Sequence, residues 1–313
     1  MAAPILVTGS HRSGTTWAGR MLAVSPGVGY VHEPFSPRRW PGWSRRRVPH
    51  WYQYVCGENE AEYVRLVEDV VAFRYPPETL LRVRHARQAF QVAEEAPWAL
   101  WHRLRGSRPL IKDPIALMSA GWLAERFGMQ VVVMIRHPAA FAGSLVRLDW
   151  PRFDFRNWAD QPLFLRDQAK PYEEPIRSFD PERQDLIDES VLLWNVIHHV
   201  IEGYRDRHPD WAFLRHEDLA EEPVKGFQGL FERLDLVWDG TAERIIVRSS
   251  TDEARKEVPA HLHRTVRRDS RSARWTWARR LTPDQLERVR EGTAEVASAF
   301  YGDEDWTPPD EVG

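Results

Sequence analysis

The sequence has almost no cysteine and no long hydrophobic run. Cys56 is the only cysteine among 313 residues, which excludes an internal disulfide and a zinc site built on cysteines and fits a reducing compartment. The longest strongly apolar stretch, "VVVMI" at 131–135, is far shorter than the roughly 20 residues that span a bilayer. The N-terminus carries no basic segment ahead of its short apolar run. We therefore expect a soluble, cytoplasmic protein without a membrane span.

A strong excess of either charge is also missing. Lys plus Arg total 43 against 46 for Asp plus Glu, giving a net charge of −3. Because nucleic acids attract proteins with strongly basic surfaces, this balance predicts no nucleic-acid partner. Basic chemistry must be local, and arginines gather at 38–47 and 264–280. Several of the 15 tryptophans lie in such polar, arginine-rich segments, where aromatic side chains often line binding clefts.

A lysine is missing from what otherwise reads as a phosphate-binding loop. In "VTGSHRSGTTW" at 7–17, Gly9 and Gly14 have the P-loop spacing, but Thr15 replaces the lysine and Arg12 appears three positions earlier. A turn between a strand and a helix gathers backbone N–H groups and the positive helix end, which suits an anion. Kinases also need a metal-binding aspartate at a strand end, yet the run 131–135 ends in Arg136. The sequence thus predicts phosphate binding without a metal.

Short apolar runs alternate with segments of helical periodicity along most of the chain. The runs typical of strands lie at 4–8, 108–114, 130–138 and 211–219, and helical spacing follows from residue 15 and at 116–128, 139–148 and 185–207. This alternation predicts an α/β protein with a doubly wound, mostly parallel sheet flanked by helices. The length fits one large domain with insertions at about 34–107 and 149–183, and the stretches 34–60 and 149–183 within them are weakly periodic.

Two segments together carry a family resemblance. "HRSGTTW" followed by "VVVMIRHPAAFAGSLVR" resembles the sulfotransferases that use 3′-phosphoadenylyl sulfate (PAPS), whose fold is similar to that of P-loop NTPases. The resemblance places Arg12 at the residue that stabilises the bridging oxygen as the sulfuryl group leaves. It places Arg136 and Ser144 on the 3′-phosphate. The remaining loop residues that it assigns to the 5′-phosphosulfate are Ser13, Gly14, Thr15, Thr16 and Trp17.

Two C-terminal segments extend the resemblance. "RRDSRSARWTWARRLTPDQ" is similar to the loop in which an arginine closes over the 3′-phosphate; Arg268 is the nearest match, with Arg267 and Arg271 as alternatives. "LRHEDLAEEP" at 214–223 resembles a segment in which a tyrosine contacts adenine, but His216 stands there. The resemblance implies PAPS as donor, 3′-phosphoadenosine 5′-phosphate (PAP) as product, and no metal.

The general base is not fixed by this resemblance. The cytosolic branch of the family uses a histidine in a K-x-H segment, where this chain has Pro114. The chain is closer to the carbohydrate and bacterial branches, which pair a loop arginine with a glutamate base. Glu33 in "YVHEPF" is our expected base, with His32 or Asp113 as alternatives, and Lys112 is expected to add positive charge. A purely structural role for Glu33, pairing with Arg12 or capping a helix, stays open.

Two other functions compete with sulfuryl transfer. One is a small-molecule kinase that uses magnesium and ATP, and the other is a non-catalytic nucleotide or RNA binder. Neither explains the spacing of Arg136 and Ser144. For a sulfotransferase, the two insertions would form the walls around a small-molecule, carbohydrate or glycolipid acceptor with a reactive hydroxyl or amine. The sequence leaves a homodimer open.

Overall fold

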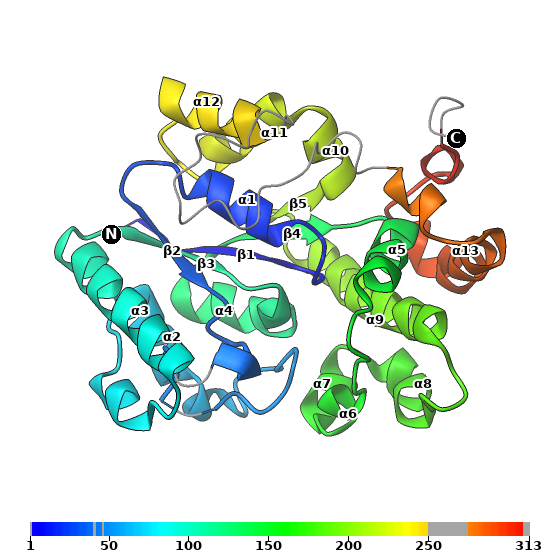
Figure 1. Ribbon diagram of the computed structural model, residues 1–313, viewed down its shortest axis with the longest axis horizontal. Coiled ribbons are helices and arrows are strands. Elements are labelled where there is room, and N and C mark those ends of the chain that lie inside the picture. The colour runs from blue at the N-terminus through cyan, green and yellow to red at the C-terminus, as the bar shows by residue number, and fades with distance from the viewer. Residues whose placement is uncertain (1, 40–41, 46, 250–274, 309–313) are drawn as a thin grey trace.

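Five parallel strands form the centre of the molecule. The computed structural model describes residues 2–39, 42–45, 47–249 and 275–308 (Figure 1). Within them, the strand order is β2-β3-β1-β4-β5 and every neighbouring pair is parallel. The strands are β1 (Ile5–Gly9), β2 (Val28–His32), β3 (Arg108–Lys112), β4 (Gln130–Ile135) and β5 (Ala212–Arg215). The predicted α/β class with a parallel sheet is confirmed.

Helices cover both faces of this sheet. Figure 1 shows α1 (Thr15–Leu22), α10 (His216–Glu221), α11 (Pro223–Arg233) and α12 (Gly240–Ser249) over one face, and α4 (Ala120–Phe127) and α9 (Leu186–Arg207) over the other. Alternate strand residues point to opposite faces. Ile5 and Val7 therefore join a buried cluster with α1 and α11, whereas Leu6 joins a second cluster with α4 and α9. None of the described helices is long and apolar enough to cross a membrane.

The two insertions contain more helix than the sequence suggested. The first holds α2 (Val64–Val71) and α3 (Ala86–Leu104), and the second holds α6 (Arg156–Ala159), α7 (Pro162–Asp167) and α8 (Glu173–Ser178). The helices of the second insertion have only one or two turns and are too short to show a 3.6-residue period. Trp158 and Phe164 from the second insertion are fully buried in the same cluster as Leu6 of β1. This shared core supports the single-domain organisation that we propose.

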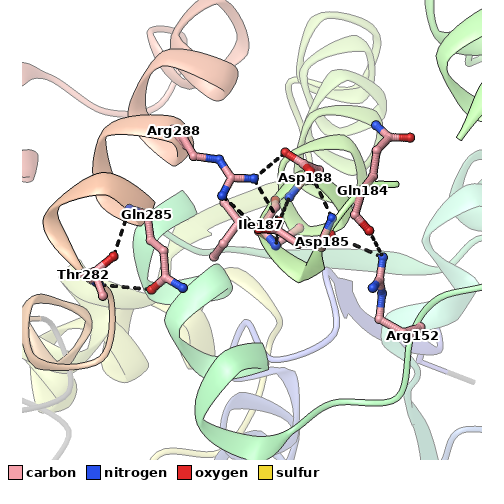
Figure 2. A network of polar contacts seen from close by, with 9 residues as sticks. Arg152, Gln184, Asp185, Ile187, Asp188, Thr282, Gln285 and Arg288 are labelled. Atoms are coloured by element: carbon pink, nitrogen blue, oxygen red, sulfur yellow. Dashed lines mark hydrogen bonds and ion pairs between the residues drawn. The ribbon is translucent and has the colours of Figure 1, made fainter. Parts of the chain in front are cut away.

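A polar network fixes the C-terminal helix to the start of α9 (Figure 2). Asp185 caps the first turn of α9, and Thr282 caps α13 (Pro283–Ala297). Arg288 of α13 donates to Asp185 at 2.8 Å and to Asp188 at 2.7 Å. Arg152, which follows α5 (Pro138–Leu148), donates to the carbonyl oxygens of the two residues that precede α9. The network therefore also holds the chain that leaves α5.

Candidate functional site

The carboxyl ends of all five strands meet at one edge of the sheet. The loop 10–14 follows β1, Glu33 follows β2, Lys112 ends β3, Arg136 follows β4 and His216 follows β5. β1 lies between β3 and β4, so the chain connections run in opposite directions on its two sides. Ligands of open α/β sheets bind at such a point, beyond the carboxyl ends of the strands. The residues predicted from distant parts of the sequence are thus brought to one place.

The backbone of the loop after β1 depends on two glycines. Gly9 has a φ of 136° and Gly14 a φ of 90°, a region that residues with a Cβ rarely adopt. A Cβ on Gly9 would lie 2.2 Å from the carbonyl oxygen of Met134, and one on Gly14 would lie 2.4 Å from Nδ1 of His216. The loop leads directly into α1 at Thr15, whose positive end faces the turn. The tight turn and helix start suit an anionic group held by backbone amides.

Arg12 connects the loop to the second predicted phosphate segment. Its φ of 67° is unusual for a residue with a side chain, and such strain is common at functional sites. Arg12 Nε donates to Ser144 Oγ at 3.2 Å, although the two residues are 132 positions apart. Arg136 Nη1 donates to the carbonyl oxygen of Arg12 at 2.6 Å. The three residues that the resemblance assigned to one nucleotide are in direct contact.

The other predicted loop residues divide into structural and cavity-facing positions. Ser13 is buried and its Oγ donates to the carbonyl oxygen of Ser10 at 2.6 Å, bracing the loop. Trp17 donates from Nε1 to Ser249 Oγ at 3.1 Å. Thr15 and Thr16 line a cavity beside the loop. Three further predicted phosphate ligands lie outside the described residues: Arg267, Arg268 and Arg271.

Glu33 is paired with a buried lysine. Lys112 Nζ donates to Glu33 Oε1, and the lysine is fully buried whereas the glutamate side chain is 26% exposed. The lysine passes beneath α1 at Gly19, where a Cβ would lie 3.0 Å from Lys112 Cγ. A buried ammonium requires a partner for its charge. The pair therefore fixes the Glu33 carboxylate at the mouth of the site.

The two alternative bases are placed differently. Asp113 is fully buried, and its Oδ2 and Oδ1 accept from the amides of Phe35 at 2.8 Å and Ile115 at 3.1 Å. Burial, and then the negative charge of Glu33, raise the Asp113 pKa. Its contacts hold the turn that carries Glu33. His32 lies outside the cavity lining, with Nδ1 3.2 Å from the hydroxyl of Tyr30.

A cavity of about 520 Å³ opens beside the loop. The loop contributes Arg12 to its lining, the first turn of α1 contributes Thr15 and Thr16, and the turn after β2 contributes Glu33. Positive charge for a leaving anion and a carboxylate able to accept a proton therefore face the same space. This is the arrangement that a group transfer to a hydroxyl requires.

The opposite wall of the cavity comes from the two insertions. Trp150 receives the Arg12 guanidinium over its ring at 5.6 Å and stacks with His11 at 5.8 Å. Trp51 and two glutamines of α3, Gln88 and Gln91, complete much of the wall. The sequence offered only a general signal for them, namely tryptophan in polar, arginine-rich segments. Their convergence depends on packing between residues that are far apart in the chain.

Two histidines at this edge are uncharged. Burial lowers the pKa of His11 to about 3, helped by the neighbouring charge of Arg12, and burial beside Arg136 does the same for His216. His11 Nδ1 lies 2.7 Å from the Tyr52 hydroxyl, which can donate to it because the ring is neutral. His216 packs against Gly14 and meets Trp17 edge to face. Both rings shape the loop as neutral groups near neutral pH.

Comparison with known proteins identifies the family. The family model described as "Sulfotransferase family" matches residues 4–240 of the chain. The chain belongs to the sulfotransferase family. The matched region of this sulfotransferase contains the loop after β1, Glu33, Lys112, Arg136 and Ser144. Among curated proteins, none matches the chain.

Solved sulfotransferases have a similar fold. A sulfotransferase domain from the curacin biosynthetic pathway aligns over 96% of this chain and 97% of its own, with a TM-score of 0.50 and 14% identity. A sulfotransferase from Alicyclobacillus acidocaldarius aligns over 98% and 99%, with a TM-score of 0.46 and 15% identity. Mouse sulfotransferase SULT7A1 complexed with PAP aligns over 97% and 87%, with a TM-score of 0.42 and 14% identity. The first alignment supports the fold.

Proposed function

We propose that this sulfotransferase moves a sulfuryl group from PAPS to a hydroxyl or amine of a small-molecule, sugar or glycolipid acceptor. One observation carries the proposal. Arg12 is in contact with Arg136 and Ser144, and it lines the same cavity as Glu33. Two cations and a hydroxyl suited to phosphates therefore adjoin a carboxylate suited to proton transfer.

The donor would occupy the phosphate side of this arrangement. PAPS supplies an activated sulfuryl group. The backbone of the loop 10–14 and the hydroxyls of Thr15 and Thr16 are the groups we assign to its 5′-phosphosulfate, with Arg136 and Ser144 on its 3′-phosphate. Arg267, Arg268 and Arg271 stay predictions for closure over the 3′-phosphate. The absence of a loop lysine favours this donor over ATP with magnesium.

Each charged residue then has a separate task in the transfer. Glu33 takes the proton of the acceptor hydroxyl, the acceptor oxygen bonds to sulfur, and the bond from sulfur to the bridging phosphate oxygen breaks. Arg12 stabilises the negative charge that the departing PAP carries away. Lys112 touches Glu33 and not the cavity, so it acts by orienting the carboxylate.

The contacts of a strand-end aspartate, Asp113, weigh against a kinase. Asp113 is a strand-end aspartate next to the loop, where a kinase would hold its magnesium. Both carboxylate oxygens accept from backbone amides, and the side chain is fully buried. A metal ligand would have to give up these hydrogen bonds.

Calorimetry and a Glu33→Gln variant test the proposal together. We expect PAP to bind in the presence of a chelator, and ATP with magnesium to bind far more weakly. Glu33→Gln keeps the shape of the side chain but removes the base, so PAP binding persists while turnover of an acceptor pool with labelled PAPS falls about 10²- to 10⁴-fold. Glu62→Gln, at an exposed glutamate outside the cavity, is the matched control and retains turnover. Near-normal turnover by Glu33→Gln would overturn the base, and absence of PAP binding would overturn the donor.

A further inference from the structure

A second arginine faces the cavity from the acceptor side. Arg38 lies on the short helix Pro37–Arg39, five positions after Glu33. It lines the 520 Å³ cavity and an adjoining space of about 140 Å³. Its guanidinium carbon lies 5.1 Å from the centre of the Trp51 ring. A cation–π contact with this ring positions the guanidinium at one wall.

The other charges of the larger cavity are already engaged. Glu33 is the one carboxylate among the described lining residues, and Lys112 neutralises it. Arg12 contacts Ser144 and belongs to the phosphate side. Arg38, by contrast, makes no hydrogen bond or ion pair with any residue that the structure describes. The acceptor side therefore carries one uncompensated positive charge.

The adjoining space leads to the same conclusion. Arg152 lines it but donates to Glu189, and Asp154 lines it but accepts from Arg156 at 2.7 Å. Each of these two ion pairs carries no net charge. Arg38 is again the charged group that has no counter-ion within the described part of the chain. An arginine that lies over a tryptophan ring and has no carboxylate partner can bind an anionic group of a ligand.

We infer that the acceptor is a hydroxylated ring compound that bears a carboxylate, and that Arg38 binds this carboxylate. The inference rests on the proposed sulfuryl transfer and specifies its substrate class. The planar guanidinium matches the two oxygens of a carboxylate, and one arginine matches one negative charge. The rings of Trp51 and Trp150 on the same lining provide apolar faces for the acceptor ring.

The remaining wall suits a ring that carries hydroxyl groups. Gln88 and Gln91 are three positions apart on α3, and both line the cavity. Amide side chains donate and accept hydrogen bonds, which matches the dual character of a hydroxyl. With the carboxylate at Arg38 and one hydroxyl at Glu33, the acceptor is oriented for transfer at that hydroxyl. The segment 33–38, which follows β2, thus supplies both the base and the specificity residue.

Matched pairs of acids and neutral analogues test this assignment. The probes are 4-hydroxyphenylacetate with its methyl ester, and the methyl glycoside of glucuronic acid with its own methyl ester, so that both members of each pair carry the same hydroxyls. We expect the wild-type protein to prefer the acid in kcat/KM by about 10- to 100-fold, the range for a charge-assisted hydrogen-bonded pair. Arg38→Gln abolishes the preference and leaves the neutral probes within about twofold of wild type. Arg47→Gln, an exposed arginine of the same segment, keeps the preference.

The outcomes separate this inference from the proposed function. PAP binding by calorimetry is unchanged in Arg38→Gln; loss of PAP binding in the wild type is a failure of the donor and not of Arg38. No acid preference in the wild type, or equal loss on acid and neutral probes in Arg38→Gln, overturns the inference. If no probe is sulfated, saturation-transfer NMR on the PAP-bound protein decides: acid binding that Arg38→Gln alone removes supports the inference, and equal binding overturns it. Arg38→Lys restores part of the preference.

Discussion

The phosphate side and the acceptor side of the cavity are built in different ways. The phosphate side consists of the loop 10–14, Arg136 and Ser144, which follow adjacent strands and touch each other through backbone and short polar contacts. The acceptor side consists of Arg38, Trp51, Trp150 and α3, which come from two irregular insertions. The sheet imposes the geometry of the first. Side-chain packing over long sequence distances imposes the geometry of the second.

The largest effect on stability is expected at Gly9, on the phosphate side, where the backbone of β4 leaves no room for a side chain. Gly9→Ala would place a Cβ 2.2 Å from a carbonyl oxygen of β4 at a φ of 136°, and we expect it to lower the free energy of unfolding by about 3–5 kcal/mol. Gly27→Ala is the control, because Gly27 also has a positive φ, 80°, but nothing lies within 4 Å of its Cβ position. That variant costs about 1–2 kcal/mol. Urea unfolding measures both, and equal losses would show that the close approach to β4 is unimportant.

A smaller, separable effect is expected on the acceptor side. Trp150→Ala removes one ring face, so we expect KM for the acceptor to rise about tenfold while the Kd for PAP is unchanged. Trp150→Phe retains a ring and loses less. Steady-state kinetics and calorimetry measure the two constants. Because Arg12 lies over the Trp150 ring, a weaker affinity for PAP in Trp150→Ala would mean that the two sides are coupled.

The smallest effect on stability is expected in the polar network of Arg288, Asp185 and Asp188 at the start of α9. The hydrogen bonds from Arg288 lower the pKa of Asp185 to about 2, so this carboxylate stabilises the fold above its unfolded pKa and loses that effect as pH falls toward 2. Arg288→Ala is expected to cost about 1 kcal/mol at pH 7, since Asp185 is largely exposed. The difference from wild type shrinks below about pH 4. Chemical unfolding at pH 7 and pH 3 measures it.

A surface ion pair provides the control for that experiment. Lys225 pairs with Glu222 at 2.8 Å, and both side chains are strongly exposed. Lys225→Ala is expected to change the free energy of unfolding little at either pH, because solvent screens the pair. A difference between wild type and Arg288→Ala that grows on acidification would contradict the assignment of the stabilising charge to Asp185.

The parts of the site that follow the sheet could be predicted from sequence. The apolar run 4–8 forms β1. The family resemblance assigned Arg136 and Ser144 to the same nucleotide as Arg12, and the structure brings them into contact with Arg12 because parallel strands end at one edge of the sheet. Short-range signals such as glycine spacing and strand hydrophobicity determine these positions. The family model matches the same region.

The acceptor wall could not be predicted in the same way. Short helices such as α6 gave no periodic signal, and nothing local indicates that Trp51 and Trp150 line one cavity. The pairing of Glu33 with Lys112 was also missed: the sequence placed both near the loop, but the direction of the lysine side chain depends on the space beneath α1. Such contacts are properties of tertiary packing, which overrides local preference.

The space beneath α1 exists because residue 19 is a glycine, and this has a consequence for how the sequence can vary. A hydrogen atom in place of a side chain at this position lets Lys112 pass beneath α1 to Glu33. A methyl group there would crowd the lysine, and a larger side chain would displace it and leave the glutamate without its buried partner. Positions 19 and 112 are therefore expected to covary among relatives, so that a bulky residue at the first accompanies loss of the lysine at the second. The residue at position 19, although it carries no charge, would then indicate whether the buried charge at position 112 is present in a relative.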